Sequence, residues 1–312
     1  MSAPVCVLGR VIARRQAVNA GRRGAQRATL GNNFKGTAVG SMMRVILFVF
    51  LVLGLFLGPH SGAMPGDYSA VAESLRGLKK MDWAVAMSVV DGDTLVLDDG
   101  RQVRLVGVQA PKLPLGRKNF KTWPLGEASK KALERLALGK RLQLSYGGSR
   151  IDRYNRALAH LHDSDGVWIQ GALLREGMAR VYSFADNRAV VSAMLSKERA
   201  ARRERRGIWK QPFYAIRTAN SVNRHIGGFQ LVEGRIRKVA TVRKMTYLNF
   251  GENWRDDFTI TLTSRSKRMF EKAGLNPAEL AGKQIRIRGW VKSRNGPMIT
   301  ATHPEQLEIL LK

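Results

Sequence analysis

The chain has 312 residues, which is enough for two ordinary domains with appendages. It carries 53 Lys and Arg against 24 Asp and Glu, a formal charge of +29. This charge favours a phosphate-rich partner such as nucleic acid, with an anionic membrane surface as the alternative. The single cysteine, Cys6, excludes an internal disulfide and a metal site built from several thiolates.

The first 63 residues have the pattern of a basic leader followed by a signal peptide. Residues 1–44 contain eight basic side chains and no acidic one. The apolar run Val45 to Leu57 has thirteen residues, fewer than the roughly 20 that a membrane-spanning helix needs. It is followed by the small residues Ser61-Gly62-Ala63, which are typical of a signal-peptidase site. We therefore expect cleavage near Ala63 and export to the periplasm or the medium.

Other interpretations of the leader stay open. Translation starting at Met42 or Met43 would leave a signal peptide of ordinary length. An uncleaved membrane anchor with a cytoplasmic basic segment is one alternative. An organellar presequence is another, because residues 10–35 are rich in arginine and free of acidic residues. Residues 64–82 are expected to form a linker.

The first folded domain is expected over residues 83–213. Short apolar runs separated by Asp-Gly turns indicate successive β-strands, and an apolar stripe at helical spacing indicates the first of three helices. The strands are expected at Trp83–Val90, Thr94–Leu97, Gln102–Val108, Leu142–Tyr146 and Ala157–Leu161, and the helices at Leu125–Leu136, Ile169–Glu176 and Arg188–Arg206. The charged run of the last helix is expected to form a solvated face.

A second β-rich domain is expected over residues 225–312, after the polar stretch at 218–224. Its strands are expected at Phe229–Val239, Met245–Phe250, Phe258–Thr263, Gln284–Val291 and Met298–Thr302, with a short helix near Met269–Ala273. Five strands with one intervening helix are typical of an OB-like β-barrel.

Four fragments of the first domain occur in a fixed order: VVDGDT (89–94), VRLVGVQAPK (103–112), DRYNRALA (152–159) and GMARVY (177–182). Their order and spacing resemble the staphylococcal nuclease (thermonuclease) family. Each fragment alone is unspecific, but four in register indicate the fold strongly. The resemblance implies a mainly β (α+β) protein, in which a five-stranded OB-type barrel carries three helices and precedes the C-terminal OB-like β-barrel.

The resemblance also implies a site. In the family, aspartates hold a Ca²⁺ ion, two arginines contact the scissile phosphate and a glutamate acts on the attacking water. Asp93 falls on the first metal-binding aspartate, with Asp91 beside it, although both residues also suit a tight turn. Arg104 and Arg156 fall on the two phosphate-binding arginines, and Tyr154 resembles the family's tyrosine near the phosphate. A guanidinium suits this task because its planar fork of donors matches phosphate oxygens.

Two positions depart from the family pattern. Gln109 replaces the second metal-binding carboxylate and is expected to contact the substrate instead, and Lys112 replaces the glutamate. Ca²⁺ prefers several anionic oxygens, so its binding is expected to be weakened or lost. Lys112 is expected to contact phosphate directly or to act in proton transfer. In the following segment, Phe120 and Trp123 either stack nucleobases or pack on the barrel.

Two functions remain as hypotheses. The first is an exported nuclease that hydrolyses phosphodiesters of DNA or RNA, with single strands as the expected partner. The second is a protein that binds nucleic acid or another anionic ligand in the same barrel without cleaving it. The retained Arg104 and Arg156 favour the first hypothesis, and Gln109 and Lys112 favour the second.

Overall fold

The structure, a computed structural model, describes residues 75–310 of the chain. The predicted leader, signal peptide and cleavage point at residues 1–63 lie outside the described residues, as does the first part of the predicted linker at 64–82. Within residues 75–310, no helix combines the length and the apolar character that crossing a bilayer requires.

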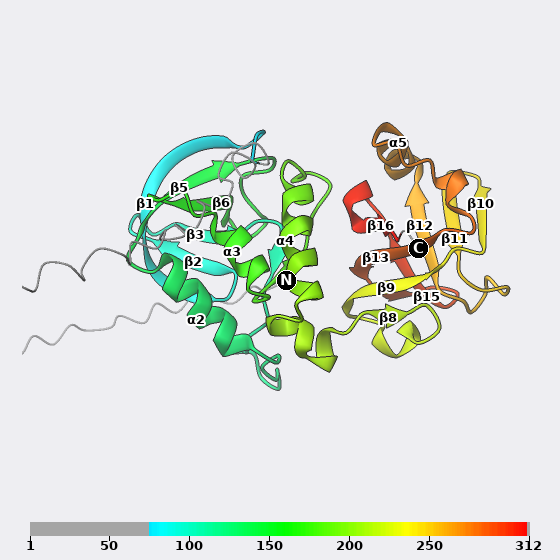
Figure 1. Cartoon of the computed structure of the whole chain (residues 1–312), viewed down its shortest axis with the longest axis horizontal. Helices are drawn as coiled ribbons and strands as arrows, with labels where there is room; N and C mark the ends of the chain where they lie inside the picture. The colour runs from blue at the N-terminus through cyan, green and yellow to red at the C-terminus, as the bar shows by residue number, and fades with distance from the viewer. Residues whose placement is uncertain (1–74, 311–312) are drawn as a thin grey trace, which may run out of the picture. The chain divides into compact units, whose positions relative to one another are not determined.

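A closed five-stranded β-barrel forms the first domain, with neighbouring strands in the order β1-β2-β3-β6-β5 (Figure 1). Its strands are β1 (Lys79–Asp91), β2 (Thr94–Leu97), β3 (Gln102–Leu105), β5 (Arg141–Tyr146) and β6 (Ala157–Asp163). The long strand β1 pairs with β5 through its first part and with β2 through its last part, and it bends at register shifts. This double pairing closes the barrel and confirms the OB-type architecture expected from the sequence.

The three predicted helices are present: the first two pack against barrel strands, and the third packs on the second. They are α2 (Gly126–Ala137), α3 (Ile169–Arg175) and α4 (Val191–Arg203). In α2, Ala132, Leu133 and Leu136 recur at helical spacing and join the barrel core, while Lys131 faces solvent. Helix α3 is followed by Gly177 at φ 70°, a left-handed conformation that glycine adopts without steric cost.

The predicted strand Gln102–Val108 is divided in the structure. Strand β3 ends at Leu105, and a separate short strand β4 (Val108–Gln109) pairs antiparallel with β7 (Arg180–Val181). The chain turns between them at Gly107, whose φ of 79° is rarely adopted by other residues. This turn carries the segment after β4 to the loop between β1 and β2, where the backbone N–H of Ala110 donates to Asp93.

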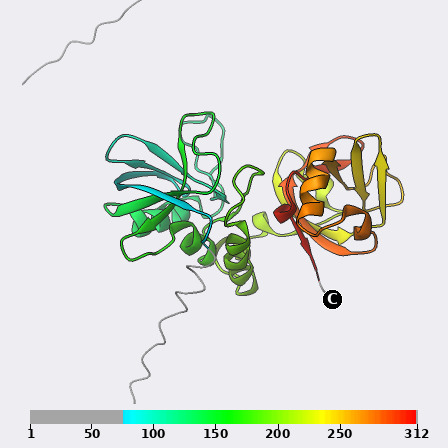
Figure 2. The ribbon, with the colours of Figure 1, turned by 90° about the horizontal axis from the view of Figure 1, so that it is seen from above.

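The C-terminal module is β-rich, as expected, and contains two sheets with the strand orders β10-β11-β12-β15-β14 and β16-β13-β9-β8. Their bounds are β8 (Arg217–Thr218), β9 (Phe229–Arg235), β10 (Lys238–Val242), β11 (Met245–Asn249), β12 (Thr259–Thr263), β13 (Gln284–Trp290), β14 (Lys292–Ser293), β15 (Pro297–Thr300) and β16 (Leu307–Ile309). Helix α5 (Ser264–Lys272) lies against β11 and β12 (Figure 2). Both sheets contribute to one hydrophobic core, which includes Leu248, Ile260 and Ile287.

Short 3-10 helices complete the described chain. They are η1 (Gly207–Lys210), η2 (Pro212–Tyr214), η3 (Val222–His225), η4 (Pro277–Leu280) and η5 (Pro304–Gln306). The first two follow α4 directly, and Ile208 in η1 is fully buried, so the chain after α4 is anchored in the core.

The expectation of a solvated face on α4 is wrong for part of the helix. Glu198 is fully buried and accepts hydrogen bonds from the backbone N–H of Val181 at 2.6 Å and from Arg288 at 3.0 and 2.9 Å. Glu308 on β16 in turn pairs with Arg288 at 2.8 Å and with Arg202 at 3.0 Å. The charged run therefore supplies an interior ion network that connects α4 to strands β13 and β16.

Candidate functional site

The turn between β1 and β2 brings two carboxylates into the barrel. Asp93 has no exposed surface, and Asp91 is also buried. Oδ1 of Asp91 accepts the backbone N–H of Asp93 at 3.0 Å, so Asp91 shapes the turn that presents Asp93. Gly92 between them has no room for a side chain, because a Cβ there would lie 2.1 Å from Oγ of Ser129 on α2. The Asp-Gly-Asp sequence thus fits a turn pressed against a helix.

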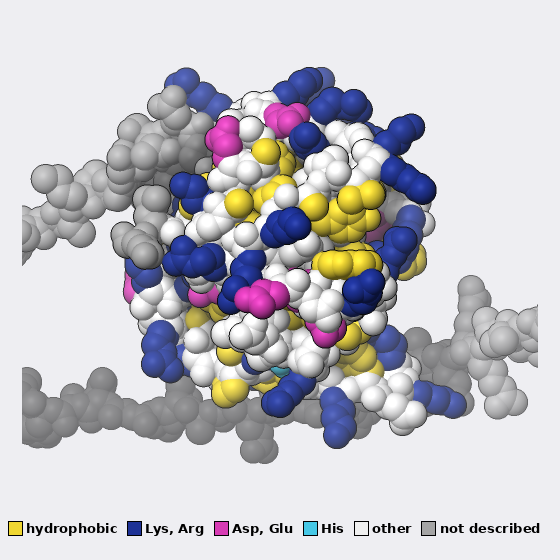
Figure 3. Space-filling model, turned by 90° about the vertical axis from the view of Figure 1, so that its right-hand side faces the viewer, with side chains coloured by type: hydrophobic (Ala, Val, Ile, Leu, Met, Phe, Trp, Pro, Cys, Tyr) yellow, Lys and Arg dark blue, Asp and Glu magenta, His cyan; other side chains and the backbone are white. Residues whose placement is uncertain are grey.

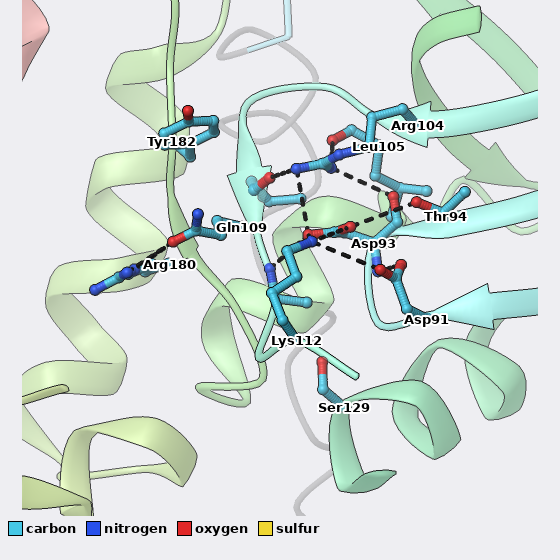
Figure 4. A network of polar contacts seen from close by, with 12 residues as sticks. Asp91, Asp93, Thr94, Arg104, Leu105, Gln109, Lys112, Ser129, Arg180 and Tyr182 are labelled. Carbon is cyan, nitrogen blue, oxygen red and sulfur yellow. Dashed lines mark hydrogen bonds and ion pairs between the residues drawn. The ribbon is translucent and has the colours of Figure 1, made fainter. Parts of the chain in front are cut away.

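Asp93 is surrounded by donors (Figure 4). Nζ of Lys112 donates to both of its carboxylate oxygens at 2.8 Å, and the backbone N–H of Ala110 donates to Oδ2 at 2.7 Å. Nη2 of Arg104 lies 3.2 Å from the same oxygen. Burial raises the pKa of the Asp93 carboxyl, but Arg104 and Lys112 together outweigh it, so the pKa lies below its ordinary value. Asp93 is therefore held as an anion by two cations.

Arg104 uses most of its guanidinium donors within the protein. Nη1 donates to the carbonyl oxygens of Leu105 at 2.6 Å and Asp93 at 3.3 Å, and Nη2 donates to the carbonyl oxygen of Val108 at 2.6 Å. Its side chain is 13% exposed. The structure therefore orients Arg104 rigidly, and an anion meets a prearranged positive charge rather than a mobile side chain.

Lys112 stands between the two carboxylates. Its Nζ lies 3.6 Å from Oδ2 of Asp91, in addition to its two contacts with Asp93. Burial raises the pKa of the Asp91 carboxyl, and the neighbouring Asp93 carboxylate raises it further. The structure thus brings Asp91, Asp93, Arg104 and Lys112 together in a cluster of two anions and two cations.

Gln109 is not part of this cluster. Its Oε1 accepts hydrogen bonds from Nε and Nη2 of Arg180 at 2.9 and 2.7 Å, on the side away from Asp93 (Figure 4). Burial lowers the pKa of the Arg180 guanidinium to about 10, and this cation lies 4.7 Å from the ring centre of Phe229. Gln109 therefore satisfies a buried arginine, and the predicted role in substrate binding stays a prediction.

A cavity of about 560 Å³ opens beside the cluster. Its lining includes the two predicted arginines and aromatic side chains: Arg104, Arg156, Tyr154, Tyr182 and Phe184. Both arginines line the cavity because β3 and β6 are parallel neighbours: Arg104 is paired with Leu158, and Arg156 lies two residues before Leu158, just ahead of β6. The cavity thus brings both predicted phosphate-binding arginines and the predicted tyrosine to one surface.

Arg156 is held in the cavity by Asp152, which the sequence reasoning missed. Nε and Nη2 of Arg156 both donate to Oδ2 of Asp152, at 2.9 and 2.7 Å. Tyr154 is largely exposed, and the guanidinium of Arg156 lies 5.4 Å from its ring centre. Asp152 stands in the same DRYNRALA fragment, four residues before Arg156, and that spacing was the available signal.

Phe120 and Trp123 lie outside the residues that line the cavity. Trp123 packs against Phe213 and Tyr214 with ring centres 5.3 and 6.5 Å apart, and both predicted aromatics are half-buried. The guanidinium of Arg117 covers the Phe120 ring at 3.7 Å. This arrangement matches the packing alternative, and base stacking by these two residues stays a prediction.

The donor set does not fit the Ca²⁺ ion that the resemblance implies. Ca²⁺ takes six to eight oxygen ligands, preferably with several carboxylates among them. Both oxygens of Asp93 already accept from Lys112, and Gln109 faces Arg180. In the part of the chain that the structure describes, no group of three or more His, Cys, Asp or Glu side chains is arranged to hold a metal ion.

Comparisons with known proteins agree with this fold. Residues 102–211 match the family described as Staphylococcal nuclease homologue. The chain is 33% identical over 130 residues to Endonuclease YncB of Bacillus subtilis, covering 40% of this chain and 60% of that protein. It is 29% identical over 180 residues to Thermonuclease of Staphylococcus intermedius, covering 57% and 99%.

An uncharacterized endonuclease of Escherichia coli is 30% identical over 124 residues, which cover 39% of this chain and 72% of that protein. The chain spans less than two thirds of some relatives: 60% of Endonuclease YncB and 43% of the SPbeta prophage-derived endonuclease YokF, also from Bacillus subtilis. The matched region contains β3, both arginines, Gln109 and Lys112.

Proposed function

The chain belongs to the staphylococcal nuclease family, and from this premise we propose that it hydrolyses phosphodiester bonds of nucleic acid in the cavity beside β3 and β6. One observation carries the proposal: Arg104 and Arg156 line the same cavity. Two guanidinium groups directed at one site can hold a phosphate and stabilise the negative charge that builds up as the bond to the attacking oxygen forms.

The ion pairs suggest how a phosphate would enter. Arg156 presents two donors to a single oxygen, Oδ2 of Asp152, and its side chain is 27% exposed. A phosphate oxygen can take the place of that carboxylate oxygen without reorienting the fork. Arg104 contributes its charge from a fixed position, since its donors are held by backbone carbonyls.

The surface charge supports a polyanionic substrate. Lys and Arg side chains are spread over the face in Figure 3, which belongs to the C-terminal module, and acidic side chains are few there. A positive surface raises the encounter rate with a polyanion and makes binding depend on salt. Single-stranded DNA or RNA suits the exposed ring of Tyr154 at the cavity, because an unpaired base can stack on it.

A second candidate function is binding of nucleic acid without cleavage. It is favoured by Lys112, whose ammonium occupies the position at which the family resemblance expects a catalytic glutamate. An ammonium that is engaged by two carboxylates is a poor acceptor for a proton from water. The same cavity would then hold a phosphodiester and leave it intact.

One assay separates the two candidates. The purified chain is incubated with end-labelled single-stranded DNA and RNA, and both the bound fraction and the cleaved fraction are measured. Replacing Arg156→Ala is expected to weaken binding about tenfold to a hundredfold, the loss of a charge-assisted hydrogen-bond pair. The control Lys131→Ala removes an exposed charge from α2 and should change binding little. Cleavage that Arg156→Ala abolishes supports the nuclease, whereas binding without any cleavage supports the second candidate.

Export is a further part of the proposal and rests on the sequence before the described residues. The apolar run Val45 to Leu57 and the small residues before Met64 support a cleaved signal peptide, with a membrane-anchored form as the alternative. N-terminal sequencing of the secreted protein tests it. A mature chain that starts at Met64 agrees with cleavage after Ala63, and a chain retained in the membrane fraction with an intact leader contradicts it.

A further inference from the structure

The centre of the carboxylate cluster is occupied by a side chain of the protein itself. Nζ of Lys112 lies 2.8 Å from each oxygen of Asp93 and 3.6 Å from Oδ2 of Asp91. This is where a cation bridging the two aspartates would have to stand. Arg104 adds a second positive charge at 3.2 Å from Asp93. The two anions are therefore balanced by two cations, and no net negative charge remains to attract a divalent ion.

The lysine is fixed in this place by its own backbone. Its carbonyl oxygen accepts the N–H of Trp123 at 2.9 Å, and two residues earlier the N–H of Ala110 donates to Asp93. Its side chain is only 22% exposed. The ammonium therefore reaches the carboxylates from an anchored segment and loses little conformational freedom when it pairs with them.

Gln109, which stands at the second metal-binding position of the family, does not face the two aspartates. Gln109 directs Oε1 to Arg180, which is itself buried and needs an acceptor. Turning Gln109 toward a metal ion would leave this guanidinium without the carboxamide. Arg180 thus keeps the Gln109 carboxamide away from the aspartates, and Lys112 occupies both oxygens of Asp93. Both contacts oppose the binding of a metal ion.

We infer that the Lys112 ammonium is a built-in cation that takes the place of a divalent metal, so that the cavity engages a phosphodiester without Ca²⁺. The inference rests on the proposed function only for the identity of the ligand. The claim about Ca²⁺ concerns only side chains of the protein and can be tested without any nucleic acid.

The first experiment titrates Ca²⁺ into the full chain by calorimetry. The wild type is expected to give no binding at millimolar Ca²⁺. Replacing Lys112→Glu removes the built-in cation and adds a third carboxylate, so a Kd of about 1 mM or tighter is expected. The matched control Lys112→Met removes the ammonium without adding a ligand and should bind at least about tenfold more weakly than Lys112→Glu. Wild-type binding as tight as that of Lys112→Glu would overturn the inference.

Thermal unfolding gives a readout if Lys112→Glu is too unstable for calorimetry. Ca²⁺ is expected to raise the Tm of Lys112→Glu by a few degrees relative to chelator, because an ion that binds only the folded state stabilises it. The Tm of the wild type should be the same in Ca²⁺ and in chelator. A rise for the wild type equal to that of the variant contradicts the built-in cation.

The second experiment measures binding of a 5′-phosphorylated single-stranded oligonucleotide in Ca²⁺ and in chelator at matched ionic strength. The wild type is expected to bind equally in both, with a Kd ratio of about one. Binding that weakens tenfold or more in chelator overturns the inference. An oligonucleotide that does not bind under either condition refutes the proposed function instead, and the Ca²⁺ titration still decides the role of Lys112.

Discussion

Asp93 shows how a buried charge can be kept at the site. Its carboxylate has no exposed surface, and burial of an unpaired charge is costly. Lys112, Arg104 and the backbone N–H of Ala110 offset that cost through four contacts at 2.7–3.2 Å. Both cations are also partly buried, and Asp93 is the nearest anion to each: Arg104 otherwise donates to backbone carbonyls, and Lys112 lies 3.6 Å from Asp91. Removing the carboxylate therefore leaves two cations without their main anion.

Replacing Asp93→Asn is expected to lower the free energy of unfolding by about 3–5 kcal/mol, because it breaks a buried ion cluster from one side. The asparagine still offers an oxygen to the backbone N–H of Ala110. The loss of stability therefore measures the missing charge and not a change in the turn. The control Asp99→Asn removes a carboxylate that pairs with Arg101 on the surface and should cost about 0–1 kcal/mol. Urea unfolding measures both variants, and equal losses would contradict a central role for Asp93.

The sequence could predict which residues meet at the site but not how each side chain turns. The resemblance of the fragments to the family implied that Asp93, Arg104 and Lys112 belong to one site, and the structure brings these three residues together. The sequence could not show that the Gln109 side chain faces away from Asp93. Its partner Arg180 lies 71 positions later in the chain and comes close only because β4 pairs with β7. Side-chain direction here depends on a long-range contact.

At the scale of single elements, β6 carries a buried histidine without a counter-charge. His160 is buried between strands, and its Nδ1 has no hydrogen-bond partner. Its ring lies 5.7 Å from that of Trp168. Burial lowers the pKa of His160 from 6.5 to about 3, and the neighbouring His162 contributes in the same direction. The folded barrel therefore favours the neutral form of this imidazole.

This strand makes the barrel sensitive to acid. Below pH 6.5 the unfolded chain takes up a proton at His160 and the folded chain does not, until the pH approaches about 3. Within that window, this residue lowers the free energy of unfolding by up to about 1.4 kcal/mol per pH unit as the pH falls. Replacing His160→Phe is expected to make the decline shallower by about that slope.

The measurement is urea unfolding at a series of pH values from 7 to about 4. A matched control is His225→Phe. His225 is only half-buried, so burial opposes the protonation of its imidazole less than it does at His160. Its slope should stay close to that of the wild type. A parallel decline in His160→Phe and the wild type would show that His160 does not titrate in this way.

Elements with a strong local pattern were predictable, and those decided by distant partners were not. Helix α2 has one apolar stripe and was predicted one residue early at each end, since Gly126–Ala137 is observed where Leu125–Leu136 was expected. The division between β3 and β4 was missed because Val106 and Val108 continue the apolar pattern through the turn at Gly107. The burial of Glu198 on α4 was missed because Arg288 is 90 positions away.

At the scale of the whole described chain, a buried ion network connects the barrel domain to the C-terminal module. Arg288 on β13 is 1% exposed and donates to Glu198 on α4 and to Glu308 on β16. Tyr182 extends this connection by accepting a hydrogen bond from Nε1 of Trp290 at 2.9 Å. Because Tyr182 also lines the cavity, the C-terminal module supports one wall of the candidate site.

Replacing Arg288→Met is expected to lower the free energy of unfolding by about 3–5 kcal/mol, since it leaves Glu198 buried with a weaker partner. Loss of the connection should also separate the unfolding of the barrel from that of the C-terminal module, so that one transition becomes two. The control Arg237→Met breaks the exposed pair with Glu252 and should cost about 0–1 kcal/mol. Urea unfolding followed by tryptophan fluorescence measures both effects.

A double-variant cycle shows whether Glu198 and Arg288 act as a pair. Glu198→Gln keeps an oxygen for the backbone N–H of Val181 but removes the charge that faces Arg288. If the two charges stabilise mainly each other, the combined variant Glu198→Gln with Arg288→Met loses less than the sum of the single losses, by about 1–3 kcal/mol. Additive losses would instead assign the stabilisation of Arg288 to Glu308, which pairs with it at 2.8 Å. In that case Arg288 would mainly hold β13 to β16 within the C-terminal module, and the ion-pair connection of α4 to that module would rest on Arg202 and Glu308, which lie 3.0 Å apart.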